Sequence, residues 1–174
     1  KAAALHYQNA LADPPPGSRY SLLMKAGECA ANSGDMATAL TSYLAAESLT
    51  KRPDALYRAG EVQLSEQKVD EAYALFQKAA ERDRSDYLSL YRLGLIDFHR
   101  KNLDSAYGYA LRSYEAFPEL SLNVELLMNI AVARGDEKTA RRLNEELASL
   151  KQREAAQQAA GAGTGSAQSS PSGH

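Results

Sequence analysis

The feature that most constrains the fold is a short stretch that occurs twice. Residues 56–60 and 90–94 share the pattern Leu-Tyr-Arg-x-Gly, so that the glycine of the first copy is Gly60 and that of the second is Gly94. Twelve residues after each glycine comes an alanine, Ala72 and Ala106. A repeat of this length is typical of a supersecondary unit that stacks on its neighbours, because one such unit cannot bury its apolar face alone.

Apolar residues spaced three and four apart predict two helices in each unit, joined by a short polar turn. The pattern continues over four units, at about 20–52, 53–86, 87–120 and 121–157. Small residues early in the second helices let the two backbones of a pair approach closely. These are Ala39, Ala72, Ala106 and Ala140, whose spacing matches that of the two glycines to within one position. The sequence therefore predicts an all-α solenoid of antiparallel helix pairs.

The two ends of the chain differ from these units. Residues 1–17 combine helically spaced Ala3, Tyr7 and Ala10 with a proline-rich turn, so we interpret them as the second helix of a truncated repeat. Its first half would then precede Lys1. Residues 158–174 are small and polar and cannot offset the entropy of ordering, so we expect a disordered low-complexity tail.

Composition narrows the classes of partner. The formal net charge is −2 and 24% of the residues are charged, which leaves no strong field for nucleic acid phosphates. A protein or peptide partner is therefore favoured over nucleic acid. No apolar run is long enough for a membrane span. A cytoplasmic location and a bacterial periplasmic or cell-envelope location both stay open.

The repeated residues resemble those of the tetratricopeptide repeat (TPR) family. The resemblance covers most of the chain, although the last unit departs from the family pattern at Met128 and Asn144. It implies a right-handed superhelical solenoid whose first helices line a concave groove that binds peptides or partner proteins. The matching residues are Leu23, Ala26, Gly27, Ala39, Tyr43 and Ala46 in the first unit, Leu56, Ala59, Gly60, Ala72, Phe76 and Ala79 in the second, and Leu90, Leu93, Gly94, Ala106 and Pro118 in the third.

The resemblance also implies which side chains face the groove. Three of these side chains are cations, Lys25, Arg58 and Arg92. Lys25 has Glu28 three residues later and Arg58 has Glu61, so we expect each of these two to form an ordinary surface ion pair within its helix. Arg92 is followed by Leu95 at that spacing, which makes Arg92 the best single candidate for a ligand contact. The predicted groove residues are Lys25, Tyr57, Arg58, Tyr91, Arg92, Leu95, Phe98, His99 and Asn129.

Catalysis finds little support in the sequence. The three histidines lie on separate segments without metal-ligand spacing, and no nucleophile, base and orienting acid cluster on the repeats. We therefore predict no metal, no cofactor and no enzymatic activity. The first hypothesis is a protein-interaction scaffold that binds a partner segment in its groove. The alternative is a structural spacer or self-associating segment of a longer TPR array, such as a bacterial envelope-assembly factor, which would form homo-oligomers through its terminal repeats.

Overall fold

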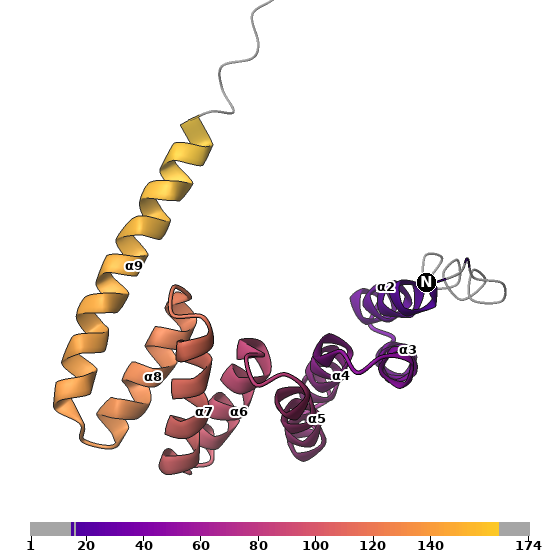
Figure 1. Cartoon of the computed structure of the whole chain (residues 1–174), viewed down its shortest axis with the longest axis horizontal. Helices are drawn as coiled ribbons and strands as arrows, with labels where there is room; N and C mark the ends of the chain where they lie inside the picture. Colours follow the sequence, from indigo (N-terminus) through magenta and orange to yellow (C-terminus); the bar gives the residue numbers. More distant parts are fainter. Residues whose placement is uncertain (1–14, 16, 164–174) are drawn as a thin grey trace, which may run out of the picture.

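The computed structural model describes residue 15 and residues 17–163, with the backbone alone for residues 160–163. Every regular element within this part of the chain is an α-helix, and consecutive helices form antiparallel pairs that stack in chain order (Figure 1). The predicted all-α solenoid of helix pairs is thus confirmed. The pairs are α2 (Arg19–Asn32) with α3 (Met36–Leu49), α4 (Pro53–Ser65) with α5 (Val69–Arg82), α6 (Tyr87–His99) with α7 (Leu103–Ala116), and α8 (Ser121–Ala133) with α9 (Glu137–Gly163).

The turn inside each pair uses the same backbone conformation. One residue per turn has a left-handed φ, and these four residues follow the repeat spacing: Gly34 at 81°, Gln67 at 62°, Lys101 at 65° and Gly135 at 76°. Glycine adopts this conformation without steric cost, whereas Gln67 and Lys101 adopt it at some cost. The geometry of the turn is therefore retained even where its preferred residue is absent.

Two of the second helices begin with an aspartate cap. Asp35 accepts a hydrogen bond from the backbone N–H of Thr38 at 3.1 Å, and Asp136 accepts one from Thr139 at 3.1 Å. Each carboxylate satisfies a backbone donor that the first turn of a helix leaves unpaired. Asp35 and Asp136 therefore fix the starts of α3 and α9.

Glycines in the first helices make room for neighbouring groups of the second helices. A Cβ added to Gly27 would lie 2.6 Å from the ring of Tyr43, and one added to Gly60 would lie 2.5 Å from the ring of Phe76. Gly94 differs, since a Cβ added to it would lie closest to a backbone atom, the nitrogen of Ala110, at 3.2 Å. The first two pairs therefore pack an aromatic ring over the glycine, and the third brings the two backbones together.

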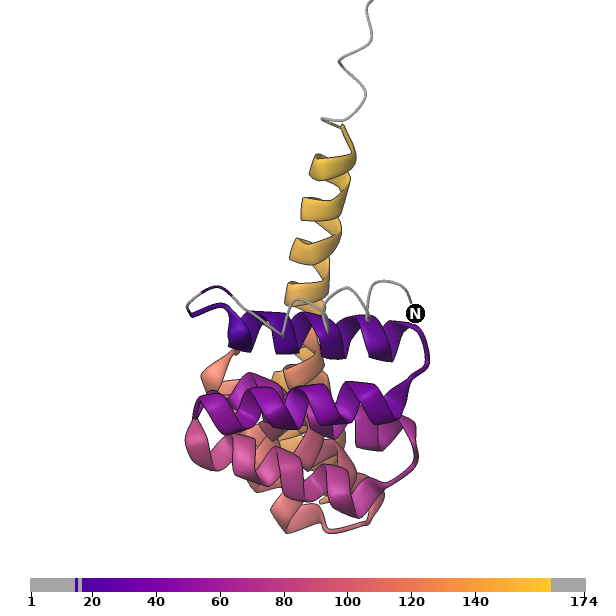
Figure 2. The ribbon, with the colours of Figure 1, turned by 90° about the vertical axis from the view of Figure 1, so that its right-hand side faces the viewer.

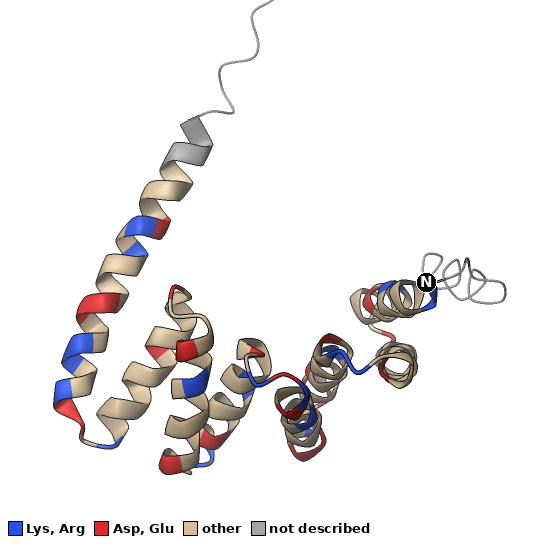
Figure 3. Cartoon of the chain, in the orientation of Figure 1, with Lys and Arg blue, Asp and Glu red and all other residues tan. Residues whose placement is uncertain are grey.

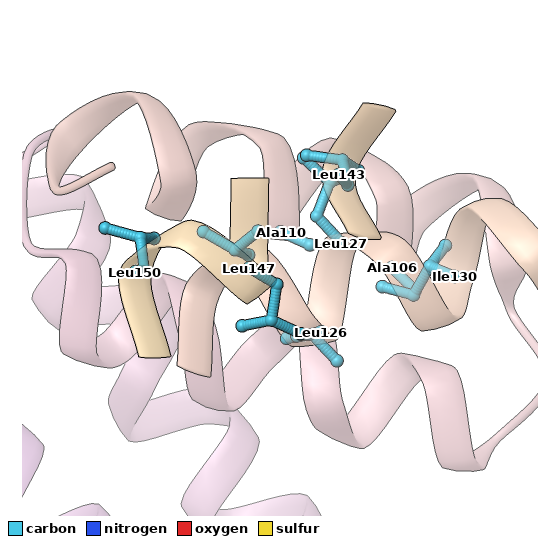
Figure 4. Packing of buried hydrophobic residues seen from close by; sticks show 9 residues of the cluster. Ala106, Ala110, Leu126, Leu127, Ile130, Leu143, Leu147 and Leu150 are labelled. Atoms are coloured by element: carbon cyan, nitrogen blue, oxygen red, sulfur yellow. The ribbon is translucent and has the colours of Figure 1, made fainter. Parts of the chain in front are cut away.

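Each helix pair shares its apolar core with the next pair. The last core cluster joins α7, α8 and α9, where leucines and an isoleucine of α8 and α9 meet alanines of α7 (Figure 4). This packing lies on one side of α9 and ends near Leu150, which is 8% exposed. The buried members of this cluster are Ala106, Ala110, Val124, Leu126, Leu127, Ile130, Leu143, Leu147 and Leu150.

At two places in the stack, an arginine at the end of a first helix contacts the second helix of the preceding pair. Arg134 forms an ion pair with Asp104 at 3.2 Å and places its guanidinium 4.3 Å from the centre of the Tyr107 ring. One repeat earlier, Arg100 makes the equivalent ion pair with Asp70 and lies over the ring of Tyr73. The same contact thus recurs at two successive junctions.

The terminal helix is longer than predicted. α9 continues to Gly163, past the predicted start of the tail at residue 158, and its far end extends beyond the stack (Figures 1 and 2). The predicted half-repeat in residues 1–17 lies outside the described residues except for its last few positions, and so do tail residues 164–174. Of the described helices, none combines the length and apolar character that crossing a membrane requires.

Candidate functional site

The predicted groove residues all lie on first helices of the pairs. Lys25 is on α2, Tyr57 and Arg58 are on α4, five residues from Tyr91 to His99 are on α6, and Asn129 is on α8. First helices also approach one another directly, since α6 contacts α8 across the stack. We call the surface formed by these residues the groove face.

A hollow of about 320 Å³ opens on the groove face between α6 and α8. Five of the nine predicted residues line it, so the structure brings together more than half of the predicted site. α8 supplies three further side chains that sequence reasoning missed. The full lining is Tyr91, Leu95, Phe98, His99, Leu122, Glu125, Leu126 and Asn129.

One apolar side chain of this lining faces solvent, since Leu122 is 52% exposed. Leu88, which comes three residues before Tyr91 on α6, is 38% exposed. Figure 3 shows that α8 carries almost no charge along its length. Leucine side chains that remain this accessible in a folded protein are often part of an interaction surface, particularly beside a hollow.

A sequence signal for this apolar surface exists in the repeat spacing. Asp54, Leu88 and Leu122 stand at the same place in three successive units. The position is therefore polar in the second unit and apolar in the third and fourth. A comparison of equivalent positions would have identified the apolar half of the groove face.

The opposite half of the groove face is charged and contains an ion pair. Arg92 on α6 lies 2.5 Å from a carboxylate oxygen of Glu61 on α4, and both side chains are less than one third exposed. The prediction that Arg92 has no charge partner is wrong, because its partner comes from the preceding unit. Lys25 and Arg58 form no ion pair within the described part of the chain, so the expected pairs with Glu28 and Glu61 are absent.

Tyr57 belongs to the same charged cluster. Its hydroxyl is hydrogen-bonded to Arg92, and its ring lies 5.8 Å from that of Phe76. Burial raises the pKa of Tyr57, and the charge of Glu61 acts in the same direction. For Arg92, burial acts to lower the pKa, but the hydrogen bond and charge of Glu61 outweigh it and raise the pKa. Arg92 therefore stays charged, and much of its charge is directed at Glu61.

Beside this cluster a smaller hollow of about 200 Å³ lies among α2, α3 and α4. Arg58 lines it together with Glu28 and Glu61, and one buried carboxylate oxygen of Glu61 has no hydrogen-bond partner. This end of the groove face suits a polar or charged group. The end between α6 and α8 suits an apolar one.

Metal-binding side chains do not gather in the part of this surface that the structure describes. Among the described residues, no cluster of three or more His, Cys, Asp or Glu side chains could hold a metal ion. His99 is exposed near the end of α6, as expected for a solvated residue, and the half-buried Cys29 is a free thiol. The described side chains of the groove face offer apolar area, hydrogen-bonding groups and charges.

Comparison of the coordinates with solved structures decides the fold. A crystal structure of MamA superposes with a TM-score of 0.73 at 18% identity, over 87% of this chain and 88% of that one. YrrB, described as a TPR protein with an unusual peptide-binding site, gives 0.65 at 17% identity over 86% and 76%. The chain has the tetratricopeptide-repeat fold.

A third TPR structure covers a shorter part of the solenoid. The first TPR of Spaghetti (RPAP3), bound to the HSP90 peptide SRMEEVD, gives a TM-score of 0.61 at 18% identity over 68% of this chain and 94% of that one. No protein-family model matches the sequence, and no curated protein sequence matches it either. The TPR fold is therefore established by the structure and not by sequence similarity.

Proposed function

We propose that this TPR chain is a non-enzymatic scaffold that binds an extended segment or a helix of a partner protein on its groove face. One observation carries the proposal. Five of the nine predicted groove residues line a single hollow between α6 and α8, beside leucines that remain exposed. The two TPR structures described with a peptide or a peptide-binding site support the same reading.

The two halves of the groove face would recognise different parts of a ligand. An apolar side chain of the partner fits the hollow between α6 and α8, where Leu122 and Phe98 would exchange water for apolar contact. Polar or charged groups of the same segment fit the end near Arg58, which forms no ion pair within the described residues. Tyr91 lines the hollow between α6 and α8 and adds rigid contact area at low entropic cost.

Affinity measurements on matched variants test the proposal. Peptides would be selected against the chain from a random twelve-residue library, and their dissociation constants measured for each variant. We expect Leu122→Asp to raise these dissociation constants by about tenfold or more, because the variant loses one buried apolar anchor. Leu49→Asp is the matched control, because Leu49 is 47% exposed but lies on α3. Equal loss in both variants, or no loss in either, would refute groove binding.

A further inference from the structure

A second hollow lies away from the groove face, between the second helices α5 and α7. Its volume is about 400 Å³, and its floor is made by the buried side chains of Ala80 and Leu93. Polar side chains surround this floor: Gln77, Glu81, Arg84, Tyr109 and Arg112. We call it the outer hollow. None of its residues belongs to the predicted groove.

The helices that border the outer hollow lack an ion pair that the preceding junction of second helices contains. Between α3 and α5, Glu47 and Arg82 form an ion pair, and Arg82 also approaches the carbonyl oxygen of Thr50 at 3.5 Å. One repeat later, Ala80 takes the place of Glu47 and Ala116 takes the place of Arg82. Two methyl groups therefore stand where the preceding junction has an ion pair of long side chains, and one of them, that of Ala80, lines the outer hollow.

The following junction is filled in another way. The positions equivalent to Ala80 and Ala116 are Tyr114 and Leu150 between α7 and α9, and the hydroxyl of Tyr114 donates to Glu146 at 2.9 Å. Leu150 is buried in the last core cluster. Among these three junctions between second helices, both positions are alanine at the junction between α5 and α7.

One wall of the outer hollow is held in place by a buried polar network. The ring of Tyr109 meets that of Tyr73 edge-on, at 6.5 Å and 85°. Tyr73 in turn donates to Asp97 at 3.0 Å, and Asp97 is only 3% exposed. Tyr109 is therefore a preorganised wall, which reduces the entropy that a ligand would have to remove on binding.

The rim carries two cations against one carboxylate. Arg84, in the loop after α5, and Arg112, on α7, are both exposed, and neither forms an ion pair or a hydrogen bond with the described residues. Guanidinium groups bind carboxylate and phosphate oxygens through paired N–H donors. The position of Arg112 is occupied one repeat later by Glu146, which Tyr114 already engages. Arg112 has no such partner in the part of the chain that the structure describes.

We infer that the outer hollow is a second binding site, which takes an anionic side chain of a partner protein between Arg84 and Arg112. The carbon stem of that side chain rests on Ala80 and Leu93, and its oxygens meet the two guanidinium groups. A carboxylate and a phosphorylated side chain share this chemistry. The inference is independent of groove binding, because the two surfaces share no residue.

Three hexapeptides that differ only in their central pair would test this site on the ¹⁵N-labelled chain at low ionic strength. The pair is two glutamates, two glutamines, or phosphoserine with glutamate. We expect the anionic peptides to cause saturable shifts in the amide signals of Leu93, Tyr109 and Arg112, and the glutamine peptide to cause none. Tighter binding of the glutamate peptide indicates a carboxylate side chain as the ligand, and tighter binding of the phosphoserine peptide indicates a phosphorylated one. Equal shifts with the glutamine peptide would overturn the inference.

Variants locate the binding. Arg84→Gln and Arg112→Gln should each lower the affinity for the tighter-binding peptide by about tenfold, since each removes a charge-assisted contact. Arg19→Gln is the matched control, an exposed arginine on α2 that also forms no ion pair within the described residues, and it should leave the affinity unchanged. Unchanged affinity in Arg84→Gln and Arg112→Gln, or equal loss in Arg19→Gln, would overturn the inference.

Filling the hollow gives a test that keeps both arginines. The double variant Ala80→Glu, Ala116→Arg rebuilds the ion pair seen between α3 and α5, and we expect it to abolish the peptide shifts. A folded double variant that still binds with full affinity would contradict the site. If the double variant does not fold, the single arginine variants decide the matter alone, because both side chains are exposed and their replacement leaves the core intact.

Discussion

Glu61 and Arg92, which belong to different repeats, form a half-buried ion pair 2.5 Å long on the groove face. The pair joins α4 to α6 and includes the hydroxyl of Tyr57. The second carboxylate oxygen of Glu61 is buried without a hydrogen-bond partner. Glu61 therefore depends on Arg92 for compensation of its charge, and Arg92 stabilises the junction between two repeats as well as contributing to the surface.

Replacing Arg92 should consequently lower stability. We expect Arg92→Met to reduce the free energy of unfolding by about 1–2 kcal/mol, because it leaves the Glu61 carboxylate without its cation. Arg58→Met is the control, since Arg58 is exposed and forms no ion pair within the described residues, and its effect should stay within about 0.5 kcal/mol. Urea unfolding followed by circular dichroism measures both. Equal stability of the two variants would mean that the ion pair contributes nothing.

Two helical glycines should respond in opposite directions to the same substitution. Gly60→Ala places a methyl group 2.5 Å from the fully buried ring of Phe76, and we expect a loss of about 1–3 kcal/mol in the free energy of unfolding. Gly108 on α7 is exposed with nothing near its Cβ position, so Gly108→Ala should stabilise by about 0.5–1 kcal/mol through helix propensity. Thermal unfolding of both variants provides the measurement, and stabilisation by Gly60→Ala would contradict the packing described.

The cap of α9 should make stability depend on acid pH. Hydrogen bonds from the side chain and backbone of Thr139 hold the pKa of Asp136 below its ordinary value. A carboxyl whose folded pKa is lowered stabilises the fold above its unfolded pKa of about 3.9, and this contribution is lost as pH falls through the folded pKa. Asp136→Asn keeps a capping side chain but removes this titration.

The comparison of Asp136→Asn with the unchanged chain is therefore made as a function of pH. We expect the difference in melting temperature between the two to be largest near pH 7 and to shrink steadily between pH 4 and pH 2. Melting curves recorded by circular dichroism at each pH give this difference. A difference that stays constant over the whole range would show that the carboxylate charge of Asp136 does not stabilise the cap.

Sequence periodicity was enough for the fold class, because the turn alanines and the paired glycines report local packing that recurs in each unit. It failed for Arg92, since the rule of three- and four-residue spacing describes a single helix and the partner, Glu61, lies on the first helix of the preceding unit. The same limit applies to Leu122, whose importance depends on how α8 lies beside α6. Contacts between repeats require the relative placement of helices, which local spacing does not contain.

The third repeat also shows where family resemblance stops being informative. Ala110 stands where the preceding units have the rings of Tyr43 and Phe76, and the backbones of α6 and α7 close the gap instead. Ala80 and Ala116 likewise stand where an ion pair fills the preceding junction. At these positions the packing follows from the residues of the individual repeat and not from the family pattern.

The most direct test of the central claim is a titration of the methyl-labelled chain with a peptide selected from the random library. We expect saturable shifts of the methyl signals of Leu88 and Leu95 on α6 and of Leu122 on α8, while those of Leu44 and Leu49 on α3 stay in place. Shifts confined to the α3 leucines, or saturable binding that leaves Leu95 and Leu122 unperturbed, would contradict the proposal that the groove face binds the partner.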